Sequence, residues 1–159
     1  VKRGNSCMNI VWHYLDKRAA TIDVIKDYNS MKHIIDNTDD DIAILHDGMM
    51  SPSAPVNDGM PSVHNPKANE SRIAFSIDKI DVLKERLRQA IEYMNWFQPA
   101  WDELTEDEQF VLYEFYMVED QSRTDAVHTI CDYFKIERSS AYNKKNRALE
   151  RLTLLLYGK

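Results

Sequence analysis

Residues 129–157 read TICDYFKIERSSAYNKKNRALERLTLLLY, in which two helical patterns are separated only by residues 135–138. At about 100° of rotation per residue, the second pattern has a mainly apolar side and a polar side. The side predicted to face inward holds Ala141, Lys145, Ala148, Leu152 and Leu155, and the opposite side holds Ser139, Tyr142, Asn143, Asn146 and Glu150. Two helices joined this closely are typical of a helix-turn-helix, whose second helix enters the major groove of DNA. We therefore predict this motif, with its last helix from about 139 to 157.

The outward side of the last helix carries the candidate DNA contacts. Short polar side chains in the first turns are suited to base edges, so we expect base contacts from Ser139, Ser140 and Asn143. Asn143 can present a donor and an acceptor together to adenine. Basic side chains neutralise phosphates irrespective of sequence, and those expected to contact the DNA backbone are Arg138, Lys144, Arg147 and Arg151. For each basic residue, an ordinary solvated helix face is the alternative.

The charge of the chain is unevenly distributed. The 20 Lys and Arg residues against 26 Asp and Glu residues give a net charge of −6, which alone argues against a nucleic-acid partner. Residues 101–120, however, carry eight acidic groups and no basic group, whereas residues 134–159 carry seven basic and two acidic groups. The basic end is the electrostatic pattern expected of a DNA-binding segment.

Shorter helices are predicted upstream of the basic end. Thr105 and Glu108 have the spacing of a capping box, in which each side chain bonds the other's backbone N–H, so a helix is expected to begin there. Its inward side chains are expected to be Val111, Leu112, Phe115 and Tyr116. A further helix, near 124–134, carries Val127, Ile130, Cys131 and Phe134 on one side.

Residues 136–142 (IERSSAY) followed by 147–152 (RALERL) resemble the recognition helix of sigma-factor region 4. Residues 129–134 are similar to the first helix of that motif, and residues 104–116 to the helix before it. Cys131 stands where the family commonly has Ala, and Lys135 where the turn commonly has Gly, so Lys135 would need a left-handed or adjusted turn. The whole chain resembles the RinA/ArpU-like late-gene transcriptional regulators of phages and prophages of Gram-positive bacteria. The resemblance implies a non-catalytic regulator that binds double-stranded DNA, with RNA polymerase as a candidate second partner.

The first half of the chain is predicted to form a long helical hairpin. One helix is expected over about 8–35, ending at the acidic run Asp36–Asp41, and a second carries apolar residues every three or four positions from Ile73 to Met94. Four of the five prolines fall in residues 48–69, which predicts a linker or mobile loop. The apolar stripe serves either as intramolecular core or as a seam between copies of the chain. We accordingly expect a hairpin for oligomerisation or partner binding in residues 1–98 and a DNA-binding domain in residues 104–159.

The composition bounds the remaining possibilities. Four Gly and five Pro residues are too few for a turn-rich β fold, so the chain is expected to be all-α. No phosphate-binding glycine pattern and no metal-ligand spacing occurs, and His128 with Cys131 would make only half of a zinc site, so we expect no enzyme, metal or cofactor. Two distant cysteines and no apolar run of membrane-spanning length favour the cytoplasm, and the resemblance implies that of a bacterial host. Val1 and Met8 both remain open as the true N-terminus.

Two other functions fit the same pattern. A phage DNA-packaging protein of the terminase small subunit type would also join a helix-turn-helix to an oligomerising helical hairpin. A helical adaptor that binds only proteins would keep the fold without DNA, although the basic end weighs against it.

Overall fold

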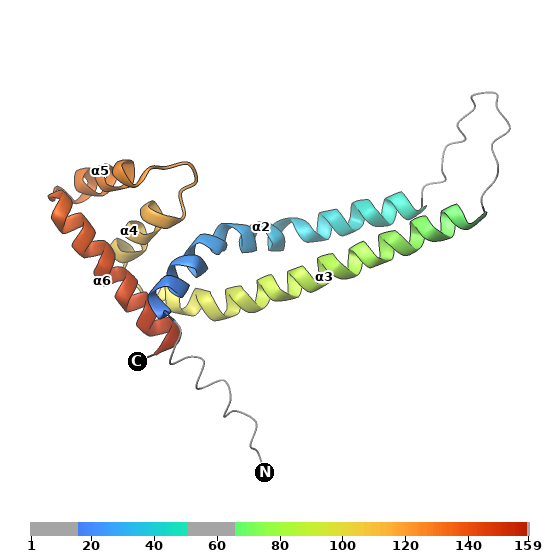
Figure 1. Cartoon of the computed structure of the whole chain (residues 1–159), viewed down its shortest axis with the longest axis horizontal. Helices are drawn as coiled ribbons and strands as arrows, with labels where there is room; N and C mark the ends of the chain where they lie inside the picture. Colours follow the sequence, from blue (N-terminus) through green and yellow to red (C-terminus); the bar gives the residue numbers. More distant parts are fainter. Residues whose placement is uncertain (1–15, 51–65, 159) are drawn as a thin grey trace, which may run out of the picture. The chain divides into compact units, whose positions relative to one another are not determined.

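The computed structural model describes residues 16–50 and 66–158, which form α-helices and no strand. In chain order the helices are α2 (Lys17–Met50), α3 (Pro66–Asp102), α4 (Glu106–Tyr116), α5 (Arg123–Phe134) and α6 (Arg138–Tyr157) (Figure 1). The predicted all-α class is confirmed. The predicted beginning of the first helix near residue 8 and most of the predicted proline-rich loop lie outside the described residues.

The acidic run at residues 36–41 does not end the first helix, as the sequence had suggested, because α2 continues to Met50. The Asn37 Nδ2 atom donates to the carbonyl oxygen of His33 at 2.8 Å, and the Thr38 hydroxyl donates to that of Ile34. These polar side chains are therefore satisfied within the helix. Thr38 is buried, while Asp39 and its acidic neighbours face solvent, so the run forms the polar side of a continuous helix.

The second long helix also exceeds its predicted bounds, since α3 includes Pro99 and ends at Asp102. A proline in the last turn of a helix removes one backbone N–H that would otherwise bond the preceding turn, so the end of α3 needs other support. Packing holds that turn: Phe97 and Ala100 are buried, and the Trp101 ring stacks on Phe97 with centroids 5.6 Å apart.

The chain divides into two compact units, and the division differs from the predicted one at residues 98–104. One unit comprises Val1–Ser30 with Met94–Lys159, and the other is Met31–Tyr93. The first turns of α2 belong with α4–α6 because they bond to them: the Thr21 and Thr153 hydroxyls are 2.9 Å apart, and Asn29 Nδ2 donates to the carbonyl oxygen of Met117 at 2.8 Å. The sequence pattern showed helices but not these tertiary partners.

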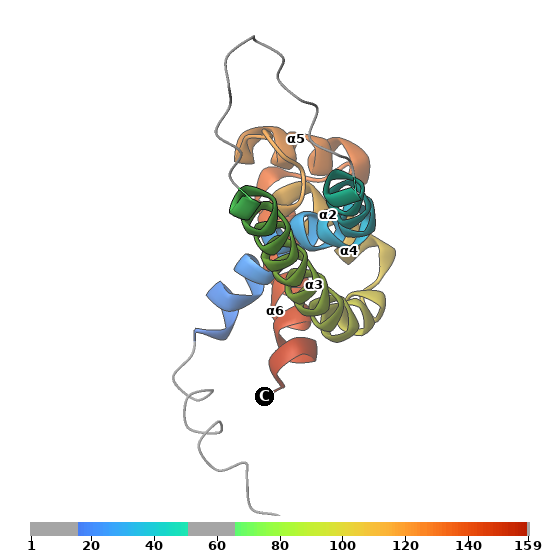
Figure 2. The ribbon, with the colours of Figure 1, turned by 90° about the vertical axis from the view of Figure 1, so that its right-hand side faces the viewer.

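In the other unit, residues 31–50 of α2 and 66–93 of α3 run side by side in both views (Figures 1 and 2). Few side chains of this unit are buried. Among its described residues they are Thr38, Ile80 and Ala90.

Helices α4, α5 and α6 pack on one another around a core centred on Val111, Val127, Ile130 and Ala141. On α6 the predicted inward residues Ala141, Ala148 and Leu152 are fully buried, and Leu149 joins them. Leu155 is 40% exposed, so its predicted inward position was wrong. The packed side turns instead to Tyr157 at the end of the helix, where its ring meets Trp96 edge-on at 5.7 Å.

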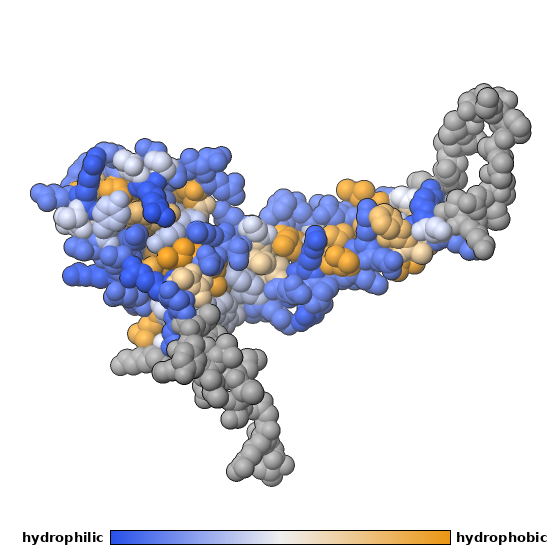
Figure 3. All heavy atoms as spheres, viewed as in Figure 1, coloured by the Kyte–Doolittle hydropathy of each residue, from blue (hydrophilic) through white to orange (hydrophobic). Residues whose placement is uncertain are grey.

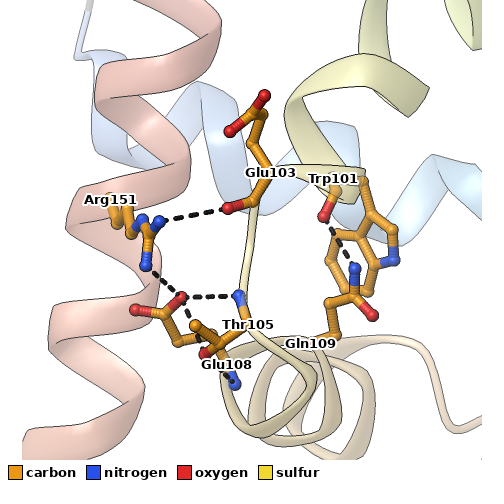
Figure 4. Close-up of polar contacts among 6 residues, drawn as sticks. All are labelled: Trp101, Glu103, Thr105, Glu108, Gln109 and Arg151. Atoms are coloured by element: carbon orange, nitrogen blue, oxygen red, sulfur yellow. Dashed lines mark hydrogen bonds and ion pairs between the residues drawn. The ribbon is translucent and has the colours of Figure 1, made fainter.

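The predicted capping box at the start of α4 is confirmed and is tied to α6 (Figure 4). The Thr105 N–H donates to Glu108 Oε2 at 3.0 Å, and the Glu108 N–H donates to the Thr105 hydroxyl at 3.4 Å. Arg151 of α6 donates to the same Glu108 oxygen at 2.8 Å and to the carbonyl oxygen of Glu103 at 3.1 Å. One carboxylate thus caps α4 and anchors α6.

Lys135 makes the turn between α5 and α6 in the left-handed conformation, with φ 54° and ψ 46°, as its place in the sequence predicted. The following residue, Ile136, bonds back to the carbonyl oxygen of Cys131 at 3.2 Å and packs against the core. A side chain at a left-handed position costs about 1 kcal/mol that glycine avoids.

Replacing Lys135 by Gly should therefore remove a strain of about 1 kcal/mol and raise the free energy of unfolding. The measured gain should be smaller than this, because glycine also has greater conformational freedom in the unfolded chain. Urea denaturation of the two proteins measures the difference. Lys135→Ala is the matched control, because it removes the same charge and keeps the strain. An equal gain from Ala would attribute the effect to charge and contradict the proposed strain.

A second prediction concerns the contribution of Glu108 to stability and its dependence on pH. Burial raises the pKa of this carboxyl, but the hydrogen bonds from Thr105 and Arg151 outweigh it and hold the pKa below its ordinary value. Because the folded state then binds fewer protons, the stabilisation is complete above about pH 5 and is lost as the pH falls through the folded pKa. Glu108→Gln should cost about 1 kcal/mol at neutral pH and progressively less in acid. Urea midpoints measured across pH test this, with Glu106→Gln in the same turn as control, and a pH-independent cost would contradict it.

Candidate nucleic-acid interface

The first turns of α6 combine an exposed polar side with a buried apolar side. Ser139, Ser140 and Asn143 are exposed, while Ala141 between them is completely buried against α4 and α5. The structure thus brings together the three predicted base-contacting residues on one accessible surface, which we call the α6 outer face. Tyr142 is 43% exposed and its ring lies 6.0 Å from that of Phe115, so it packs partly on α4.

Two of the four predicted phosphate contacts are committed to other side chains. The Lys144 ammonium lies 3.5 Å from Asp107 and 4.1 Å above the centroid of the Phe134 ring. Arg151 is held by Glu108 and the Glu103 carbonyl, as described above. Both cations therefore hold α6 to its neighbours, and they are not part of the interface that we propose.

The other two predicted contacts are exposed. Arg138, the first residue of α6, places Nη2 2.9 Å from Nε2 of His128 on α5. Arg147 is exposed and, among the described residues, has no hydrogen bond or ion pair. It lines a small hollow with Thr105, Asp107, Glu108, Val111 and Lys144. Arg138 at the start of α6 and Arg147 on the α6 outer face therefore remain available to a ligand.

Three further cations come from three helices, and two of them, Arg18 and Arg123, were not among the residues that the sequence singled out. Burial lowers the pKa of Lys145, and the positive charges of Arg18 on α2 and Arg123 on α5 lower it further. Its ammonium lies 5.1 Å from the Phe115 ring and 5.3 Å from the Tyr142 ring. Within the described part of the chain none of the three cations forms an ion pair, although Arg18 donates to Asn146 Oδ1 at 2.7 Å. We call Arg18, Arg123 and Lys145 the basic cluster.

The basic cluster could not be found from sequence periodicity. Arg18 is more than a hundred positions before Lys145, and Lys145 was expected to face inward. Only tertiary packing places these like charges within electrostatic reach of one another. The positive charges of Arg18 and Arg123 lower the pKa of Lys145, and none of the three has an acidic partner among the described residues, so a bound anion such as phosphate would stabilise the basic cluster.

The described residues contain no group of three or more His, Cys, Asp or Glu side chains placed to hold a metal ion. Within residues 16–50 and 66–158, no helix combines the length and the apolar character needed to cross a membrane. No protein-family model, curated protein or solved structure matches the chain.

Proposed function

We propose that this chain is a sequence-specific regulator of transcription that binds double-stranded DNA, with α5 and α6 acting as a helix-turn-helix. The observation that carries the proposal is that the first turns of α6 have one buried apolar side and one exposed polar side. Its inner side is fixed by the burial of Ala141 and Ala148, and its outer face offers Ser139, Ser140 and Asn143 to a ligand. Side chains in the first turns of such a helix are the ones that reach base edges in the major groove.

Positive charge flanks the α6 outer face and supports the same proposal. At about 100° per residue, Arg147 projects on this face between Asn143 and Ser140, whereas Arg138 and Lys145 project about 100° or more away from Ser139, toward the packed side of α6. Arg18 and Arg123 add charge beside Lys145. A helix in the major groove lies between two phosphate backbones, so cations on and beside the side that enters the groove can contact phosphates.

The resemblance to RinA/ArpU-like regulators specifies the biological role we propose. The protein would be encoded by a phage or prophage, act on late genes in the cytoplasm of the bacterial host, and work together with RNA polymerase. A DNA-packaging protein of the terminase small subunit type would use the same α6 outer face. The two are separated by capturing and sequencing the genomic fragments that the protein binds: a regulator selects a promoter region and raises transcription from it, whereas a packaging protein selects a packaging site and engages the large terminase subunit.

The role of the basic cluster predicts a strong salt dependence. Each phosphate neutralised contributes about 0.9 to the slope of log K against log salt concentration. Arg123→Ala should therefore reduce the magnitude of that slope by about one and weaken binding to cognate and random duplexes alike. Lys32→Ala, an exposed change in the other unit, is the control and should leave the slope unchanged. Affinity of the unaltered protein that does not vary with salt would contradict phosphate binding altogether.

Sequence choice is predicted to depend on Asn143. Asn143→Ala should cost about 1–3 kcal/mol on the cognate site, because a bidentate contact to adenine is lost, and much less on random DNA. Glu150 lies on the same outer side two turns further along α6, so Glu150→Ala is the matched control and should cost nothing on either duplex. Competition binding with cognate and scrambled duplexes measures all four values. An equal loss on both duplexes would make Asn143 a positioning contact, and no loss on either would show that another face of α6 meets the bases.

A further inference from the structure

The unit formed by residues 31–93 has an open apolar groove between its two helices. The groove has a volume of about 660 Å³ and is lined by Asp41, Ile44 and Leu45 of α2 and by Phe75, Asp78, Lys79, Val82, Leu83 and Arg86 of α3. Figure 3 shows apolar side chains, in orange, gathered along this part of α2 and α3. The groove lies within the unit of residues 31–93, whereas the α6 outer face belongs to the other unit.

The side chains of the groove are unusually exposed for their type. The exposed fractions are 68% for Ile44, 59% for Phe75 and 52% for Val82. Two helices alone form a single layer and cannot cover both of their sides, so such an apolar surface normally packs on another layer. Nothing in the described part of the chain covers it.

The charged side chains of the groove indicate which molecule packs on it. Asp78, Val82 and Arg86 are four residues apart and therefore share one side of α3. Asp78 and Arg86 are about 12 Å apart along the helix, which is beyond the reach of an ion pair. Neither has an ionic partner among the described residues.

Neighbouring charges on α3 behave differently. Arg88 forms ion pairs with Glu85 and Glu92, and its hydrogen bond holds the pKa of Glu85 at about 2. This trio is satisfied within its own helix. Asp78 and Arg86, on the groove side, have no such partner among the described residues and are able to pair with another chain.

We propose that a second copy of this chain occupies the groove, with the two α3 helices antiparallel about a two-fold axis at Val82. Asp78 and Arg86 are equidistant from Val82, so this axis places Asp78 against Arg86 of the partner subunit and Arg86 against Asp78 of the partner subunit. A two-fold interface must be complementary to itself, and a surface with one acid and one base symmetrically placed around an apolar centre meets that condition. A nucleic acid, an anionic membrane or a strongly charged peptide would meet like charges among the two acids and two bases that line the groove. The inference does not depend on DNA binding.

The mass of the full chain in solution tests this assembly. Sedimentation equilibrium across micromolar concentrations should give twice the chain mass, and Val82→Asp should weaken association at least about tenfold with unchanged helix content by circular dichroism. Lys84→Glu, an exposed charge reversal on the opposite side of α3, should leave the mass unchanged. A monomer at every concentration, or a dimer unaffected by Val82→Asp, would overturn the proposal.

Charge reversal tests the register. Asp78→Lys and Arg86→Glu should each weaken self-association, because each sets like charges opposite one another at both ends of the interface. An equimolar mixture should form heterodimers, since both pairs are then of opposite charge, and mass spectrometry of the native complexes counts them. Random mixing of the two variants would overturn the antiparallel register. Repeating the measurement with Asn143→Ala separates this result from any failure of DNA binding, because that change should not alter the mass.

Discussion

The burial of one side of α6 is the constraint on which the candidate interface depends. Ala141 and Ala148 have no side-chain bulk beyond Cβ, so α6 approaches α4 and α5 closely, and Leu149 and Leu152 continue the contact with no exposed surface. A helix fixed in rotation by four buried side chains presents its opposite residues in fixed directions. The orientation of Ser139, Ser140 and Asn143 is thus a consequence of packing and not of the polar residues themselves.

A second set of contacts fixes α6 along its length. Arg151 ties it to the capping box of α4, Lys144 pairs with Asp107, and Thr153 meets Thr21 of α2. These contacts also explain the acidic segment at residues 101–120. Glu106, Asp107 and Glu108 lie at the positive end of the α4 dipole and receive two cations from α6. The acidic segment at residues 101–120 and the basic segment at residues 134–159 are therefore linked by ion pairs in the fold.

The local elements of the second half of the chain could be predicted because their signals are local. The capping box of Thr105 and Glu108 and the limits of α6 to within about one residue follow from short-range rules. The resemblance to sigma-factor region 4, in which Gly is common at the turn, indicated a left-handed or adjusted turn at Lys135. The limits of α2 were wrong because a run of Asn, Thr and Asp favours a turn in isolation but is held in a helix by its i−4 bonds and by the burial of Thr38. The grouping of residues 1–30 with 94–159 was missed because it rests on tertiary contacts that periodicity does not encode.

The candidate interface was likewise predicted only in part. There is a physical reason why its polar residues could be predicted and its cations could not. Side chains on the outer side of an amphipathic helix are identified by angle, so the positions of Ser139, Ser140 and Asn143 could be expected. The role of a cation depends instead on its partner in space. Arg151 and Lys144 have acidic partners from α4 that offset their charge, while Arg18, Arg123 and Lys145 have no acidic partner among the described residues. The chain carries a net charge of −6, yet within its described residues it pairs Lys144 and Arg151 of α6 with acids and leaves the basic cluster and Arg147 without acidic partners. In a chain of this kind net charge is a poor guide to the partner, and the distribution of unpaired charge is a better one.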